Sequence, residues 1–218
     1  MVELFIEYSR YVMYFSVLLA LLSLIFYWKF DKALKYFAGY LILSGATEYL
    51  ASEFTKSLGY NLFLLHPYTI LEFILLSGFF KVVFDQLGSK FSMLKITIVV
   101  VPLCILNSIF IQPMEGFNSY ATTLVGLILI AYSVYTYYLL LEKDSVEFYG
   151  IKWLVGGVLI YQMTSLIILA SANILIDTTE GSDIIIWIIR AIVILATKII
   201  FGFVLIKEIL KPRLSLQF

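Results

Sequence analysis

The segment IIIWIIRAIVILATKIIFGFVLIK, residues 184–207, decides the fold class of this chain. It exceeds the roughly twenty apolar residues that a helix needs to cross a bilayer core of about 30 Å. Apolar side chains occupy both odd and even positions, which argues against the alternating pattern of a membrane β-strand. The segment therefore predicts a transmembrane helix, although it contains two basic residues, Arg190 and Lys198.

Six further segments have similar length and character. They cover residues 9–28, 33–54, 62–84, 93–111, 120–141 and 151–174. Short connectors with turn-forming residues separate them, and no linker or soluble domain remains between the spans. The sequence therefore predicts an all-α integral membrane protein, a bundle of seven transmembrane helices that forms a single domain over residues 1–218.

Composition agrees with this fold class. The chain has 218 residues, of which 62% are hydrophobic and 14% charged. Soluble domains are about half apolar and about a quarter charged, and a water-soluble fold of this size cannot bury so much apolar surface. Because the 15 basic and 15 acidic residues balance, no basic surface for nucleic acid is expected, and the first expected partner is the lipid bilayer.

Basic residues are distributed unevenly between the two sides of the predicted bundle. One side carries Lys29, Lys32, Lys35, Lys81, Lys90, Lys95, Lys143, Lys152, Lys207, Lys211 and Arg213. The other side carries Arg10 and Lys56 among the acids Glu3, Glu7, Glu53, Glu115, Asp177, Glu180 and Asp183. Because cytoplasmic loops of membrane proteins are rich in Lys and Arg, the sequence predicts an N-terminus outside and a C-terminus in the cytoplasm.

Several ionisable residues lie inside the predicted spans. Glu48, Glu72, Arg190 and Lys198 are deep, and His66 lies nearer the outer surface. An ionisable side chain in a membrane is costly unless it faces the bundle interior and has a partner. Since two acids and two bases balance, we expect them to pair, and Glu72 to need Arg190, Lys198, a ligand or a proton.

The outer half of the bundle holds most of the other polar residues. Tyr68 shares a helical face with Glu72, and Gln162 shares one with Ser165 and Asn173. Together these side chains predict a polar pocket that opens outward, although interhelical hydrogen bonds that only fix packing are an alternative interpretation. The candidate ligand-binding or pairing residues are Glu48, His66, Tyr68, Glu72, Asn107, Gln162, Arg190 and Lys198.

The segment NLFLLHPYTILEF carries a resemblance to a known family. Its pattern of Asn-Leu, His, Tyr-Thr and Glu-Phe is formed by Asn61, Leu62, His66, Tyr68, Thr69, Glu72 and Phe73. In this pattern it resembles a family of seven-helix inner-membrane proteins of Bacteroidetes-type bacteria, although Pro67 replaces the aliphatic residue expected there. The resemblance implies a multi-pass protein of the bacterial inner (plasma) membrane, and it implies no particular activity.

The last span resembles the final helix of microbial rhodopsins. Lys198 lies midway along it, in the run ATKIIFGFVLI, and in rhodopsins such a lysine holds retinal. The resemblance implies retinal as a cofactor, but this chain has Ile194 where rhodopsins have an acid, and it lacks their patterns in the third and sixth helices. We therefore expect no cofactor, and a Lys198 side chain that reaches toward the cytoplasmic interface.

No residue pattern indicates catalysis or metal binding. One histidine and two buried glutamates are too few for the three or more converging ligands of a zinc site. No serine-hydrolase motif or phosphate-binding glycine loop is present. Glycines within the spans, Gly156 and Gly157 among them, are interpreted as close helix contacts. We expect no catalytic residues and no metal ligands.

The sequence favours a non-enzymatic membrane protein. Its pocket would bind a small molecule or lipid as a sensor, or the chain would be a subunit that binds a protein partner in the membrane or at its cytoplasmic face. A small-solute or proton-coupled transporter is the alternative, but the first and last three helices show no internal repeat and the inner half offers no polar path. A lipid-modifying enzyme and a retinal-binding protein rank lower.

Overall fold

The computed structural model describes residues 2–141, 149–170 and 182–211. In these ranges the chain forms seven long helices: α1 Val2–Ile25, α2 Lys32–Leu58, α3 Leu65–Gln86, α4 Met93–Leu106, α5 Ser119–Leu141, α6 Tyr149–Ala170 and α8 Ser182–Leu210. Short 3-10 turns precede α2 and α3, at Tyr27–Lys29 and Leu62–Leu64. The predictions for Lys143, Asn173, Asp177, Glu180 and Arg213 lie outside the described residues, as do those for the side chains of Glu3 and Asp183.

Six of these helices are long and apolar enough to cross a membrane, as a multi-pass membrane protein requires. The exception is α2, whose apolar run is interrupted by Tyr, Ser, Gly, Thr and Glu residues. Its 27 residues would still extend about 40 Å. The all-α class is therefore confirmed, whereas a seventh membrane crossing by α2 stays a prediction.

Helix ends depart from the predicted spans where local chemistry outweighs hydropathy. The first helix was expected over 9–28, but α1 covers Val2–Ile25, because polar residues near its start are compatible with a helix that extends into water. The side chain of Asp31 caps α2 by accepting a hydrogen bond from the Leu34 N–H at 2.8 Å. Gly59, at φ 80°, ends α2 in the left-handed conformation. The predicted end of the sixth span, residue 174, lies outside the described residues.

The fourth span changes its helical form before it ends. A single helix was expected over 93–111, but α4 stops at Leu106 and a π-helical turn, η3, covers Asn107–Ile111. This turn places the side chains of Asn107 and Ser108 in the interior. π-helical turns often occur at functional sites, so the position of this turn indicates a site near the polar end of the bundle.

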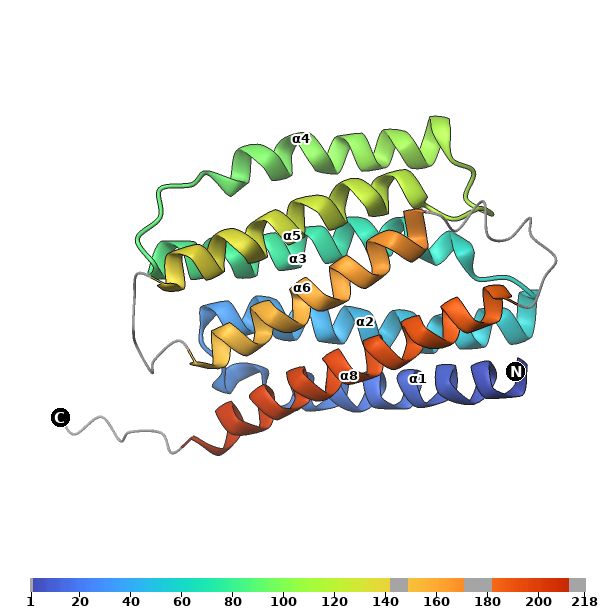
Figure 1. Cartoon of the computed structure of the whole chain (residues 1–218), viewed down its shortest axis with the longest axis horizontal. Helices are drawn as coiled ribbons and strands as arrows, with labels where there is room; N and C mark the ends of the chain where they lie inside the picture. Colours follow the sequence, from blue (N-terminus) through green and yellow to red (C-terminus); the bar gives the residue numbers. More distant parts are fainter. Residues whose placement is uncertain (1, 142–148, 171–181, 212–218) are drawn as a thin grey trace.

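The helices run side by side as a bundle (Figure 1). α1 packs against α2 and α8, α2 also packs against α3, and α6 packs against both α5 and α8. α4 lies at the edge of the bundle, against α3 and α5. Consecutive helices from α1 to α6 alternate in direction, so α3 and α5 begin at the same end of the bundle. α8 begins at this end too.

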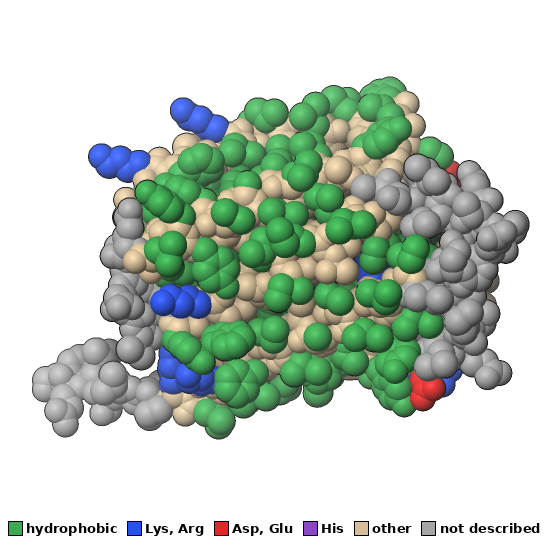
Figure 2. All heavy atoms as spheres, viewed as in Figure 1, with side chains coloured by type: hydrophobic (Ala, Val, Ile, Leu, Met, Phe, Trp, Pro, Cys, Tyr) green, Lys and Arg blue, Asp and Glu red, His purple; other side chains and the backbone are tan. Residues whose placement is uncertain are grey.

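The opposite end carries most of the described basic residues, and we call it the lysine-rich end. Lys29, Lys32, Lys90, Lys95 and Lys211 lie at the helix termini there, and Figure 2 shows basic side chains gathered at this end of an otherwise hydrophobic flank. Large exposed apolar side chains occur along every helix, including Leu21, Ile98, Leu127, Ile167 and Phe203. Such a surface suits lipid rather than water.

An aromatic cluster fills the bundle toward the lysine-rich end. The ring of Phe37 from α2 lies 5.3 Å from that of Phe79 and 4.9 Å from that of Phe201, in edge-to-face geometry. Phe80 and Phe84 continue the cluster along α3, and all five side chains are almost fully buried. Edge-to-face pairs of this kind stabilise a packed core. Around these rings the described interior holds only isolated small hydroxyl groups, such as those of Ser23, Ser133 and Thr136.

Candidate functional site

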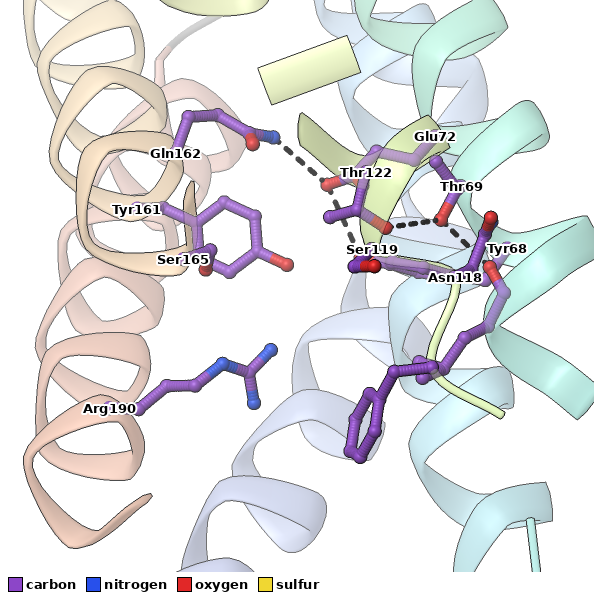
Figure 3. A pocket seen from close by; sticks show the side chains of 12 residues that line it. Tyr68, Thr69, Glu72, Asn118, Ser119, Thr122, Tyr161, Gln162, Ser165 and Arg190 are labelled. Carbon is purple, nitrogen blue, oxygen red and sulfur yellow. Dashed lines mark hydrogen bonds between the residues drawn. The ribbon is translucent and has the colours of Figure 1, made fainter. Parts of the chain in front are cut away.

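A cavity of about 30 Å³ lies among the helix starts at the end away from the lysine-rich end (Figure 3). A single water needs about 10–15 Å³ of such volume, so the cavity has room for about two. α3, the start of α5, α6 and α8 all contribute to its wall. The lining residues are Leu65, Tyr68, Thr69, Glu72, Phe117, Asn118, Ser119, Thr122, Tyr161, Gln162, Ser165 and Arg190.

The first turns of α3 supply the acidic side of the cavity. Pro67 lies in the first turn, where its missing N–H removes little from the helix ladder. The hydroxyl of the next residue, Tyr68, donates a long hydrogen bond of 3.4 Å to Oε1 of Glu72, four residues ahead. Glu72 is 4% exposed, so its carboxyl group lies within the bundle.

Two neighbouring helices hold these α3 side chains in place. The Gln162 amide of α6 donates a hydrogen bond of 3.2 Å to the same Oε1 atom of Glu72. The hydroxyl groups of Thr69 and Thr122 lie 3.3 Å apart and join α3 to α5. Thr69 also donates to the Leu65 carbonyl at 2.8 Å. The cavity wall is therefore a hydrogen-bonded contact of three helices.

Arg190 of α8 supplies the basic side of the cavity. Figure 3 shows its side chain extending from α8 toward the space between the helices. Its guanidinium lies 5.8 Å from the ring centroid of Trp187, which in turn stacks on Phe117 with centroids 5.7 Å apart. Nε of Arg190 is buried and has no hydrogen-bond partner among the residues that the structure describes. Among the described residues no carboxylate lies within 4.0 Å of the guanidinium.

Four of the eight candidate residues meet at this cavity: Tyr68, Glu72, Gln162 and Arg190. The expected ion pairs between the deep charges do not form. The salt bridges of the described residues join Lys56 to Glu53, Lys81 to Asp85 and Lys211 to Glu208, all near helix ends. Glu72 is instead held by two neutral donors, which satisfy one of its oxygens but supply no positive charge.

His66 and Asn107 lie beside the cavity rather than in its wall. Nδ1 of His66 lies 2.8 Å from the Ser108 hydroxyl, and the ring is 1% exposed. The Nε2 atom is buried and has no hydrogen-bond partner among the described residues. His66 is thus buried within the bundle, in the first turn of α3.

Asn107 supports the wall through its amide. Its Nδ2 atom donates to Oε1 of Gln112 at 3.0 Å and to Oδ1 of Asn118 at 2.9 Å. Because Asn118 lines the cavity, the π turn of the fourth span is linked directly to the site. Asn107 therefore has a positioning role in this geometry.

Lys198 and Glu48 lie away from the cavity. The expectation that Lys198 reaches toward the cytoplasmic interface is wrong, because its side chain is 4% exposed and Nζ donates to the Ser44 hydroxyl of α2 at 2.7 Å. Because the Lys198 amine has a hydrogen-bond partner inside the bundle, its side chain does not need to extend to water. Glu48, one turn beyond Ser44, is half-buried and close enough to interact electrostatically with Lys198 without forming an ion pair.

Sequence reasoning missed the part of the site that comes from the connector before α5. Phe117 and Asn118 line the cavity, and Gln112 anchors them through hydrogen bonds to Ser119 and to the Tyr120 N–H at 2.8 and 3.0 Å. Turn-forming residues in this connector indicated an exposed loop. Its two amide side chains, Gln112 and Asn118, lie close to the ends of two spans. They were the signal in the sequence that part of the connector is buried.

The polar groups of the site are suited to electrostatic attraction and to hydrogen bonding rather than to metal binding. Among the described residues no three His, Cys, Asp or Glu side chains gather in a way that could hold a metal ion. The cavity instead combines one carboxylate, one guanidinium and several neutral polar groups.

Comparisons with protein families, with curated proteins and with solved structures found no match for the chain.

Proposed function

We propose that this chain is a non-enzymatic protein of the bacterial inner membrane that binds a small polar molecule or a lipid headgroup in an outward-facing cavity. In this proposal the chain acts as a sensor or as a partner-binding subunit of a membrane complex. Its N-terminus is outside and the lysine-rich end faces the cytoplasm, in accordance with the distribution of basic residues.

One observation carries the proposal: Glu72 and Arg190 line the same small cavity without forming an ion pair. Charged side chains within a membrane are costly, and they are typically found on ligand or ion pathways or paired with one another. Residues that served packing alone would be expected to pair directly. A cavity that keeps two opposite charges apart is suited to a ligand that contacts both.

The packing below the cavity favours binding over transport. Phe37, Phe79 and Phe201 form a closely packed cluster between the cavity and the lysine-rich end. A transported solute would have to displace these buried rings. The transporter alternative therefore has no observation in its favour.

Accessibility of the cavity from outside is tested by cysteine labelling. Cys104, which is 2% exposed, gives little background. We expect Thr122→Cys, in the cavity wall, to react with the small membrane-impermeant reagent sulfonatoethyl methanethiosulfonate applied to intact cells. Ser77→Cys, 4% exposed on the other side of Glu72, is the matched buried control and should stay unlabelled.

Two exposed positions calibrate the experiment. Glu115→Cys should react from outside, and Lys90→Cys only after the membrane is permeabilised. Labelling of Thr122→Cys from the cytoplasmic side alone, or from neither side, would count against an outward-facing cavity.

A further inference from the structure

The cavity has a group of hydrogen-bond donors without partners. Nε of Arg190, Nδ2 of Asn118 and Oγ of Ser165 are each buried and make no hydrogen bond within the described part of the chain. All three residues line the cavity, and Asn118 and Ser165 are each 2% exposed. A buried polar group without a partner costs about 1–3 kcal/mol. Three such groups around one space indicate a ligand that accepts hydrogen bonds.

The identity of the free atom on Asn118 follows from a chain of amide contacts. The Tyr120 N–H can only donate, so the Gln112 atom 3.0 Å from it must be the oxygen. The Asn107 atom that contacts this oxygen must then be the nitrogen, because two oxygens would repel. The same nitrogen faces Asn118, which therefore presents its oxygen to Asn107 and leaves its NH₂ group free.

Glu72 provides the opposite chemistry elsewhere in the same wall. Both of its hydrogen bonds, from Tyr68 and from Gln162, end on Oε1. The second carboxylate oxygen, Oε2, is thus left for another donor. Since neither bond comes from a cation, the carboxylate also lacks a direct positive partner.

We propose that the cavity binds a zwitterion, with its ammonium group at Glu72 and its carboxylate or phosphate group at Arg190, Asn118 and Ser165. The inference rests on the proposed function and names the ligand class of that site. Free amino acids and the headgroup of an ethanolamine phospholipid share this chemistry. Because the cavity is only about 30 Å³, the charged groups enter it and any larger part of the ligand extends beyond it.

The test uses the purified full chain in phosphatidylcholine nanodiscs. Glycine and O-phosphoethanolamine are the free probes, and glycine betaine, whose ammonium has no N–H, is the matched control ligand. Binding is followed by tryptophan fluorescence, since Trp187 contacts both Arg190 and Phe117, and independently by the thermal unfolding midpoint. A second arm replaces phosphatidylcholine with phosphatidylethanolamine and detects retained lipid by native mass spectrometry.

We expect saturable binding of a free probe or selective retention of phosphatidylethanolamine, which distinguishes the two sources. Glycine betaine should bind at least about tenfold more weakly, as expected for loss of a hydrogen bond to a charged group. Glu72→Gln and Arg190→Gln should each weaken binding by a similar factor. The controls Glu48→Gln and Arg10→Gln remove charges outside the cavity and should bind like the wild type.

Absence of binding in both arms would overturn the zwitterion assignment, as would equal binding of the trimethylated probe. Unchanged affinity in folded Glu72→Gln and Arg190→Gln, with folding checked by circular dichroism and size exclusion, would overturn it too. If Thr122→Cys is labelled from outside while no zwitterion binds, the outward-facing cavity stands and only its ligand class fails.

Discussion

Gln112 shows how one side chain can organise a site that it does not line. Its amide oxygen accepts hydrogen bonds from the Tyr120 N–H and from Asn107, and its nitrogen donates to Ser119. The residue is 7% exposed, so water does not readily replace these partners. Through them the connector that carries Phe117 and Asn118 is held against the bundle.

Replacing this side chain should loosen the connector. We expect Gln112→Ala to lower the free energy of unfolding by about 1–3 kcal/mol, because buried donors and acceptors lose their partner. Gln86→Ala, at the exposed end of α3, is the control and should change it by less than about 0.5 kcal/mol. Denaturant titration in detergent micelles measures both. Equal effects would mean that Gln112 has no special role.

Residues on one helix were easier to predict than contacts between helices. Tyr68 and Glu72 are four apart, and their hydrogen bond follows from helical spacing. Lys198 and Ser44 are 154 positions apart, and nothing in their sequence indicates that they meet. A span that is apolar on every face does not reveal which face its neighbours cover, so the rotation of each helix is set only by packing.

At the scale of the helices, α1 and α2 are joined by a close contact at Gly45. A Cβ added there would lie 2.6 Å from the Ala20 Cβ and 2.6 Å from the Ser16 carbonyl oxygen of α1. Such an approach allows two helix backbones to pack closely in a membrane. Gly157 of α6 has a similar role, since a Cβ would lie 2.3 Å from the Phe201 ring. The interpretation of span glycines as helix contacts agrees with this geometry.

Gly45→Ala should therefore separate α1 from α2. We expect a loss of about 1–3 kcal/mol in unfolding free energy, the usual cost of overpacking, because backbone atoms cannot move aside. Gly39→Ala in the same helix is the matched control, since its Cβ would meet only the end of the Leu75 side chain, at 3.1 Å. If thermal unfolding shifts equally in both variants, helix propensity rather than the α1 contact governs the effect.

Element types were predictable because length and hydropathy decide them in a membrane. The polar details were not, and α4 is the clearest case. Its apolar run indicated one helix to residue 111, whereas the structure turns Asn107 and Ser108 inward through a π turn. Mean hydropathy over a whole span does not show where a π turn begins. For the same reason the partly buried connector after it was interpreted as an ordinary loop.

For the molecule as a whole, polarity is divided along the bundle axis. Phenylalanine rings fill the interior toward the lysine-rich end, and the cavity with Glu72 and Arg190 lies toward the other. The sequence could predict this division, because the order of residues along each span gives their depth. It could not predict that the two charges would line one cavity without pairing, since that depends on side-chain positions across three helices.

The most direct test is an experimental structure of the chain in lipid nanodiscs that contain phosphatidylethanolamine, with glycine added. The account predicts non-protein density between the Glu72 carboxylate and the Arg190 guanidinium, with both groups in contact with it. A direct ion pair between these side chains, with nitrogen and oxygen within about 4 Å and no density between them, would contradict the account.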